Sequence, residues 1–190
     1  HRNPDADSLG GALAFAAYCK YKKINYSLWC STPVNPCYFF LTGMHTFSMT
    51  PPDKTDALCV FDAGDAQFAG ISPLLEQYTH KPRIINIDHH ISNQQFGDVN
   101  LIVPDMPSTT AVCFSIFKEL HIPITIEIAT VMLAGILADT DTFTNPASSA
   151  TAFAIAGVLV SRGAPLFALR KKLEQTHTVS GMRIWGIALC

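Results

Sequence analysis

The stretch Arg83-Ile84-Ile85-Asn86-Ile87-Asp88-His89-His90 joins an apolar run to a carboxylate and two imidazoles. The apolar part predicts a buried strand, and the polar triplet follows the end of that strand directly. Such a triplet is difficult to explain as packing, because a lone carboxylate is costly to bury. The stretch therefore predicts a strand of a sheet and a chemical site at the end of that strand.

Three further acidic clusters occur in comparable settings. They are His1-Arg2-Asn3-Pro4-Asp5-Ala6-Asp7, Phe61-Asp62-Ala63-Gly64-Asp65 and Ala138-Asp139-Thr140-Asp141. The apolar run Ala57–Phe61 predicts a central parallel strand that is covered on both faces. Ligands of open α/β sheets bind at the carboxyl ends of the strands, so we expect Asp62 and Asp88 to be neighbours.

Strands and helices alternate along the rest of the chain. Strands are predicted over residues 24–30, 57–61, 83–87 and 99–103. Helices are predicted over 12–21, 108–120, 125–138, 148–162, 165–176 and 179–190, and within 67–78 after Ser72-Pro73. Residues 42–56 are expected to be a loop. The alternation predicts an α/β fold with a doubly wound, mainly parallel sheet, helices on both faces and a helical C-terminal part.

Composition limits the class of protein. At 190 residues, 48% hydrophobic and 15% charged, the chain suits one α/β domain with a well-buried core, or one domain with a short appendage, and not a disordered segment. The net charge is 13 − 15 = −2, which argues against tight nonspecific binding of long nucleic acid. Small phosphorylated substrates remain compatible, because bound cations would supply positive charge.

The six cysteines form no Cys-x-x-Cys pair, so we expect buried thiols and no zinc knuckle. Free thiols predict a reducing, cytoplasmic location. No signal peptide is visible, and no apolar run reaches the roughly 18 residues of a membrane span, so no membrane association is expected.

Carboxylates and imidazoles in this mixture suit divalent metal ions. The four clusters together predict a pair of ions, with Mn²⁺ preferred and Mg²⁺ or Co²⁺ as substitutes. Singly, the clusters have ordinary explanations: Asp7 as a helix N-cap, Asp5 as a turn residue, and turns at Asp62–Asp65 and Asp139–Asp141. The remaining histidines stand apart from acidic neighbours and are interpreted as surface or structural residues; they are His45, His80, His121 and His177.

At these clusters the sequence resembles the DHH phosphoesterase superfamily, which is named after the triplet seen here as Asp88-His89-His90. His1–Ser8, Phe61-Asp62 and Ala138-Asp139-Thr140 are similar to the other motifs, in the same order. Residues 86–93 and 96–100, with Ser108-Thr109-Thr110, resemble the branch of oligoribonucleases (nanoRNases), phosphoadenosine phosphate phosphatases, cyclic-dinucleotide phosphodiesterases and RecJ-type exonucleases.

The resemblance implies the roles of the site residues. One ion would be held by His1, Asp5 and Asp62. The other would be held by Asp7, His89 and Asp139, with Asp62 bridging. Asp88 would orient a histidine and His90 would contact the scissile phosphate, while a water activated by the ions attacks in line. Substrate contacts are expected from His90, Asn93, Ser108 and Thr109.

The resemblance also implies a domain organisation. Residues 1–176 would form the catalytic domain without its first strand, and residues 177–190 a connector helix towards an absent C-terminal substrate-binding domain. The expected substrate is a short oligonucleotide or a small nucleotide, and a homodimer is compatible with the sequence.

Two other functions stay open. A manganese-dependent inorganic pyrophosphatase has a similar first motif, but Asp62-Ala63-Gly64-Asp65 lacks the Asp-His pair typical of that class. A non-catalytic nucleotide-binding scaffold is the other alternative. Asp141 stands where relatives often have glycine, and it is either a solvated loop residue or a change in the site.

Overall fold

Short parallel strands form two sheets in the computed structural model, which describes residues 1–175 apart from the side chain of His45. The first sheet pairs β1 (Leu28–Trp29) with β2 (Phe47–Ser48), and the second has the order β3 (Ala57–Phe61), β4 (Arg83–Asp88), β5 (Val99–Ile102). Every strand pair is parallel. The predicted α/β class with parallel strands is confirmed.

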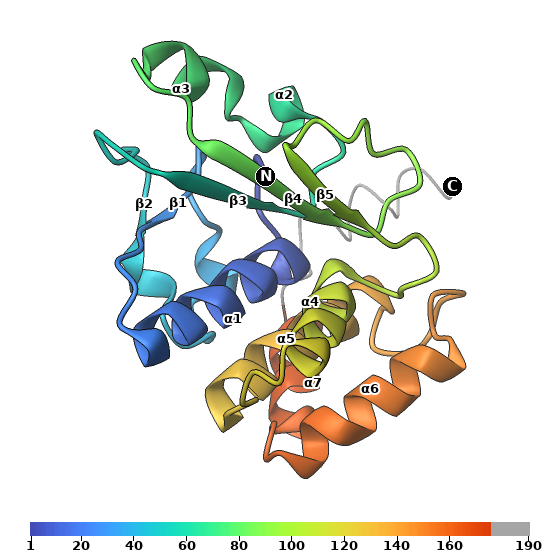
Figure 1. The fold of residues 1–190 in the computed structure, drawn as a ribbon. Helices are drawn as coiled ribbons and strands as arrows, with labels where there is room; N and C mark the ends of the chain where they lie inside the picture. The colour runs from blue at the N-terminus through green and yellow to red at the C-terminus, as the bar shows by residue number, and fades with distance from the viewer. Residues whose placement is uncertain (176–190) are drawn as a thin grey trace, which may run out of the picture.

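Helices lie on both sides of the strands (Figure 1). On one side lie α1 (Ala6–Lys22), α4 (Thr109–Glu119), α5 (Ile126–Asp139) and α7 (Leu166–Glu174); on the other lie α2 (Ala66–Ala69) and α3 (Ser72–Gln77). The outermost helix, α6 (Ala150–Ser161), packs against α5. The short 3-10 helices η1 (Pro36–Tyr38) and η2 (Met44–Thr46) connect β1 to β2.

The core is built around α5, which is apolar on all sides because it packs against α1, α4, α6 and α7. Met132, Leu133 and Ile136 of this helix are fully buried. Gly10 permits the contact with α1, since a Cβ there would lie 2.6 Å from the carbonyl oxygen of Val131. Gly11 permits a close approach of α1 to the sheet, since an added Cβ would lie 2.9 Å from the Phe61 ring.

Several predicted element boundaries were wrong. The helix predicted from residue 12 begins at Ala6, because the Asp5 side chain accepts hydrogen bonds from the amides of Asp7 and Ser8 and so caps it. The helix predicted after Ser72-Pro73, within 67–78, is confirmed as α3, but a further short helix, α2, precedes it and ends at Gly70, whose φ is 76°. The predicted loop 42–56 contains β2, while the strand predicted over 24–30 is reduced to Leu28–Trp29.

The prediction of a central position for β3 was also wrong. Among the described residues β3 pairs only with β4, so it lies at one edge of the three-stranded sheet. Its first half is partly exposed, with Ala57 and Cys59 open to solvent, and only Val60 and Phe61 are buried. The buried end is the one that leads into Asp62.

Register aligns the carboxyl ends of the strands. Phe61 pairs with Ile87, and the amide of Asp62 donates to the carbonyl oxygen of Ile87 at 3.0 Å. Asp62 and Asp88 therefore leave adjacent strands at the same edge of the sheet, as the sequence predicted.

The described thiols are free, at Cys19, Cys30, Cys37, Cys59 and Cys113. Of these, only Cys30 and Cys113 are buried as expected. Within residues 1–175, no single helix is long and apolar enough to cross a membrane. Helices α6 and α7, which are bent by 119° relative to each other, are together long and apolar enough by length and composition only. The predicted connector 177–190, with the helix 179–190, lies outside the described residues.

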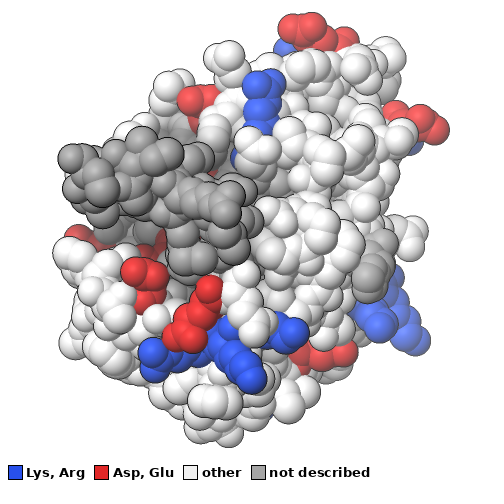
Figure 2. Space-filling view, turned by 180° about the vertical axis from the view of Figure 1, so that it is seen from behind, with Lys and Arg blue, Asp and Glu red and all other residues white. Residues whose placement is uncertain are grey.

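Charge is mixed on the face shown in Figure 2, where basic and acidic side chains lie close together. On the described part of this face, basic side chains gather at the lower edge directly beside acidic ones, and the whole chain has a net charge of −2.

Candidate metal centre

The four acidic clusters meet at the carboxyl ends of β3 and β4. His1, Asp5 and Asp7 come from the loop that leads into α1 and from its first turn, and Asp139 is the last residue of α5. Their potential ligand atoms form three overlapping groups, each within 4.8 Å: His1 with Asp5 and Asp62; Asp7 with His89 and Asp139; and Asp62 with Asp88, His89 and His90.

Asp62 lies between the groups. Its Oδ2 is 3.3 Å from Nε2 of His1, while its Oδ1 is 3.4 Å from Nδ1 of His90 and 3.9 Å from Nε2 of His89. The residue is 4% exposed and has a positive φ of 58°. An aspartate tolerates this left-handed conformation better than most residues, and such backbone strain is concentrated at functional sites.

The ring of His1 is oriented by its own loop. Nδ1 lies 2.8 Å from the carbonyl oxygen of Arg2, so a proton on Nδ1 leaves Nε2 facing Asp62 and Asp5. Burial alone would lower the pKa of this imidazole. The carboxylates of Asp5 and Asp62 outweigh that effect and raise the pKa to about 10.

His89 faces the other group. Its Nδ1 lies 3.1 Å from the carbonyl oxygen of Met106, and its Nε2 lies 3.1 Å from Oδ2 of Asp139. That second contact lacks hydrogen-bonding geometry, and Nε2 is buried without a hydrogen-bond partner. Burial acts to lower the pKa of His89, but Asp139, with Asp7 and Asp62, raises it to about 9.

Asp7 is fully buried against the N-terminus of α4. Its carboxylate accepts hydrogen bonds from the amides of Thr109 and Thr110, at 2.6 and 2.9 Å, and from Oγ1 of Thr110 at 2.7 Å. The helix N-terminus favours an anion there. Burial, followed by the nearby charges of Asp139 and Asp62, nevertheless raises the pKa of Asp7 well above its usual value.

The carboxylate of Asp88 accepts hydrogen bonds from residues that follow it closely in the chain. One oxygen accepts from the amides of His89 and His90 and from Nδ1 of His90 at 2.8 Å, and the other accepts from Nδ2 of Asn93. Burial would raise the pKa of Asp88, but these hydrogen bonds lower it. The carboxylate therefore stays charged and orients His90, whose side chain is 52% exposed at the mouth of the site.

Three residues that were expected to contact the substrate make hydrogen bonds within the protein. The amide of Asn93 donates to Asp88 and to the carbonyl oxygen of Ala63. Ser108 and Thr109 are fully buried; Ser108 caps α4, and Oγ1 of Thr109 donates to Oδ1 of Asp62 at 3.1 Å. This geometry favours a role in holding the carboxylates rather than in touching a substrate.

Two acidic residues of the clusters stay outside the site. Asp65 is the N-cap of α2, where its carboxylate accepts the amide of Phe68 at 2.6 Å. Asp141 is exposed, has φ 46°, and its carboxylate accepts Oγ1 of Thr144. The positive φ gives a physical reason for a glycine at this position in relatives, and Asp141 is a solvated loop residue.

Two contributors to the site were not predicted from the sequence. Thr110 supplies two of the hydrogen bonds to Asp7, and Phe68 stacks on His1. The Ser/Thr start of the helix at 108–110 was a signal for the first, because such residues offer hydroxyl donors beside free helix amides. Nothing local marks Phe68.

A pair of divalent cations fits this donor set. Buried carboxylates lie close enough to raise one another's pKa, and Nε2 of His89 lacks a hydrogen-bond partner. Carboxylate and imidazole ligands are those that Mn²⁺ and Mg²⁺ accept, and none of the three groups contains a thiol.

Residues 1–136 match the family model described as "DHH family, N-terminal domain". The chain belongs to this family. Membership indicates a hydrolase of the phosphoesterase type, and the three groups of residues are the part of the domain that could hold its metal ions.

Relatives and solved structures agree with the family. The chain is 29% identical over 196 residues to the bifunctional oligoribonuclease and PAP phosphatase NrnA of Thermus thermophilus, a match that covers 100% of this chain and 56% of that protein. The chain thus spans about half the length of this relative.

Two solved structures share the fold. An exopolyphosphatase-related protein of Bacteroides fragilis matches with a TM-score of 0.86 at 20% identity, over 100% of this chain and 58% of that one. A protein of Methanococcus jannaschii assigned to the family II inorganic pyrophosphatases matches with a TM-score of 0.71 at 17% identity, over 94% and 60% of the two chains.

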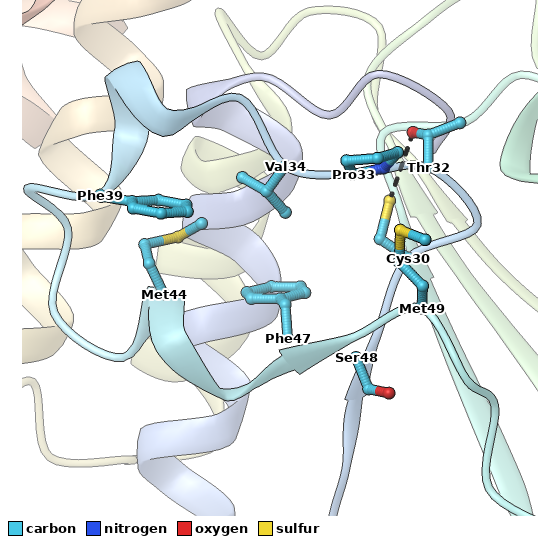
Figure 3. Close-up of a pocket in the computed structure, with 9 residues that line it drawn as sticks. All are labelled: Cys30, Thr32, Pro33, Val34, Phe39, Met44, Phe47, Ser48 and Met49. Atoms are coloured by element: carbon cyan, nitrogen blue, oxygen red, sulfur yellow. Dashed lines mark hydrogen bonds between the residues drawn. The ribbon is translucent and has the colours of Figure 1, made fainter.

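A separate pocket of about 340 Å³ opens between η1, η2 and β2 (Figure 3). Its walls are mainly apolar, with Val34, Phe39, Met44 and Phe47 converging on it. None of the candidate metal ligands lines it. Two lining residues contact the loop that carries His1: Sγ of Cys30 donates to the carbonyl oxygen of His1 at 3.3 Å, and Oγ1 of Thr32 accepts the amide of Asn3 at 2.7 Å.

Proposed function

We propose that this domain hydrolyses phosphate esters with two divalent metal ions that share Asp62. The observation that carries the proposal is the position of that carboxylate, with Oδ2 towards His1 and Oδ1 towards His89 and His90. A carboxylate whose two oxygens face two groups of potential ligands can bridge two ions in this way.

The ligand sets follow the groups of residues. One ion would take His1, Asp5 and Asp62, and the other Asp7, His89, Asp139 and the second oxygen of Asp62. Divalent ions in such a site neutralise phosphate charge and lower the pKa of water. Thr109 and Thr110 hold Asp62 and Asp7 in the positions that this ligand set requires.

His90 would contact the scissile phosphate. Its Nδ1 is engaged by Asp88, and its half-exposed ring lies beside both metal-binding groups. A hydrogen bond to one ring nitrogen fixes the direction of the other nitrogen. Here Asp88 binds Nδ1 of His90 and so fixes the direction of Nε2.

Mn²⁺ is the expected ion, with Mg²⁺ or Co²⁺ as substitutes. The proposed ligand set combines carboxylates and two imidazoles, and imidazole suits Mn²⁺ better than Mg²⁺, which prefers oxygen.

The expected substrate is a short oligonucleotide or a small nucleotide with a 3′-phosphate. Support comes from the similarity to an oligoribonuclease and PAP phosphatase and from a net charge of −2, which suits small substrates better than long nucleic acid. We propose a cytoplasmic location, as the free thiols suggest.

The proposal is tested by Mn²⁺ stoichiometry from calorimetry and elemental analysis, with Asp62→Asn beside the wild type. We expect two ions per chain in the wild type and fewer in the variant. Asp65→Asn makes the same chemical change three residues away and should bind Mn²⁺ with the wild-type stoichiometry. Asparagine is as good a helix cap as aspartate, so α2 should be kept. Equal stoichiometry in wild type and Asp62→Asn would refute the shared site.

Three substrates then separate the functions. Faster hydrolysis of a ribodinucleotide or of adenosine 3′,5′-bisphosphate than of pyrophosphate supports the proposal. Preference for pyrophosphate supports the alternative, a pyrophosphatase, whose fold this chain shares. Two bound ions without hydrolysis of any of them would indicate a nucleotide-binding scaffold.

A further inference from the structure

Phe68 stacks on the ring of His1. The two ring centroids are 4.8 Å apart and the planes are inclined by only 17°. Phe68 is 47% exposed, so much of its ring is not packed into the core. Phe68 belongs to neither hydrophobic core cluster, and its ring stacks on the imidazole of His1.

The same two segments are also joined through their backbones. The amide of Arg2 donates to the carbonyl oxygen of Phe68 at 3.0 Å, and the carbonyl oxygen of Arg2 lies 2.8 Å from Nδ1 of His1. The imidazole of His1 is thus held in two ways. Phe68 stacks on its face, and the carbonyl oxygen of Arg2 holds its Nδ1. The remaining nitrogen, Nε2, is left facing Asp62 and Asp5.

The position of Phe68 is in turn determined by the turn that follows β3. Asp65 caps α2 and accepts the amide of Phe68, and the carbonyl oxygen of Gly64 accepts the amide of Gln94. Gly70 then ends the helix close to Ser31, where any side chain would collide. The segment from Asp62 to Gly70 therefore carries a candidate metal ligand, Asp62, at its start. Near its end it carries Phe68, which supports a second candidate ligand, His1.

We propose that Phe68 is a positioning residue for His1. By stacking, it keeps the imidazole in the orientation that points Nε2 at Asp5 and Asp62, and so sets the affinity for the ion nearest those residues. The proposal rests on the two-ion function above for its consequence, but the orientation of the ring does not depend on bound metal.

The first test is made on metal-free protein by NMR. Ring-current shifts displace the carbon-bound protons of His1 in the wild type and in Phe68→Tyr, which keeps a ring. They return towards ordinary values in Phe68→Leu. Phe153→Leu is the matched control, since Phe153 is 54% exposed and stacks on Phe143 at 4.6 Å and 21°. His1 shifts that are the same in wild type and Phe68→Leu overturn the proposal.

The second test is Mn²⁺ calorimetry on the same four proteins. Phe68→Leu should lower the affinity for one of the two Mn²⁺ ions by about 10-fold to 100-fold, as the loss of a residue that supports a metal ligand does in other proteins. The affinity for the second ion should stay unchanged. Phe68→Tyr and Phe153→Leu should bind as the wild type does. Unchanged affinity for both ions in Phe68→Leu overturns the proposal. If the wild type binds no ion, the proposed function fails, and the NMR result alone decides the positioning role.

Discussion

The carboxylate of Asp7 accepts two hydrogen bonds from Thr110, one from the amide at 2.9 Å and one from Oγ1 at 2.7 Å. These atoms lie 103 residues apart in sequence and are fully buried. The pair links the first turn of α1 to the first turn of α4 at the floor of the metal centre. Donors from a helix N-terminus allow a carboxylate to be buried there without a cation already in place.

Removal of the Thr110 hydroxyl should therefore destabilise the fold. Thr110→Val keeps the shape of the side chain but takes one hydrogen-bond donor from a buried carboxyl group, which costs about 1–3 kcal/mol. Thr130→Val, which removes an exposed hydroxyl of α5, should change the free energy of unfolding by less than about 0.5 kcal/mol. Denaturant unfolding in EDTA measures both, and equal effects would contradict the argument.

Gly135 leaves room for the same pair. A Cβ at this position would lie 2.5 Å from Oδ1 of Asp7 and would collide with the Thr110 hydroxyl. We expect Gly135→Ala to cost about 1–3 kcal/mol through overpacking and to weaken Mn²⁺ binding.

The matched control is Gly157→Ala in α6, where nothing lies within 4 Å of an added Cβ. There the helical preference of alanine should stabilise the protein by about 0.5–1 kcal/mol. Thermal unfolding measures the stability of both variants, and calorimetry measures their Mn²⁺ binding. If Gly135→Ala were stabilised and bound Mn²⁺ normally, the idea that position 135 has no room for a side chain beside Asp7 would be wrong.

The metal-free protein should lose stability as the pH rises. The folded pKa values of His1 and His89 are raised from 6.5 to about 10 and about 9. Because a raised pKa means that the folded state holds its protons more tightly, this contribution is complete below pH 6.5. It is lost as the pH passes through about 9 to 10. Asp7 and Asp139, whose pKa values are also raised, act with the same sign.

Melting temperatures in EDTA between pH 6.5 and 10 test this slope. His1→Gln should flatten it, since one of the two histidines no longer titrates. Saturating Mn²⁺ should oppose it, because the ions compete with protons for imidazoles and carboxylates and bind more tightly at higher pH. A melting temperature that rises with pH in EDTA would contradict the proton linkage.

His90 is expected to act on the substrate and not on the ions. His90→Gln should keep the Mn²⁺ stoichiometry and lower kcat/KM by about 10²-fold or more, the usual effect of losing a positioned catalytic side chain. His80→Gln, a change of the same kind at an exposed residue outside the metal-binding groups, should leave both quantities unchanged. Loss of an ion in His90→Gln would instead make His90 a ligand.

Local signals explain which elements were predictable. The strand at 57–61 is a continuous apolar run, and the strand at 83–88 is marked by Ile84, Ile85 and Ile87. The starts of α4 and α6 carry serine caps at Ser108 and Ser149. The two-residue strands β1 and β2 have no such pattern, because each is stabilised by its partner rather than by its own sequence. The edge position of β3 was not predictable either, since an apolar run does not reveal how many neighbours a strand has.

The sequence by itself determined the membership of the DHH family, the parallel α/β class and the carboxylates and imidazoles available at the ends of β3 and β4. These features follow from residue order, because parallel strands bring their carboxyl ends to one edge of a sheet. The tertiary structure alone decided which atoms meet. It placed Thr109 and Thr110 on Asp62 and Asp7, occupied Asn93 with Asp88, and laid Phe68 on His1. Such contacts join segments distant in the chain, and their geometry depends on how α1, α4 and α5 pack.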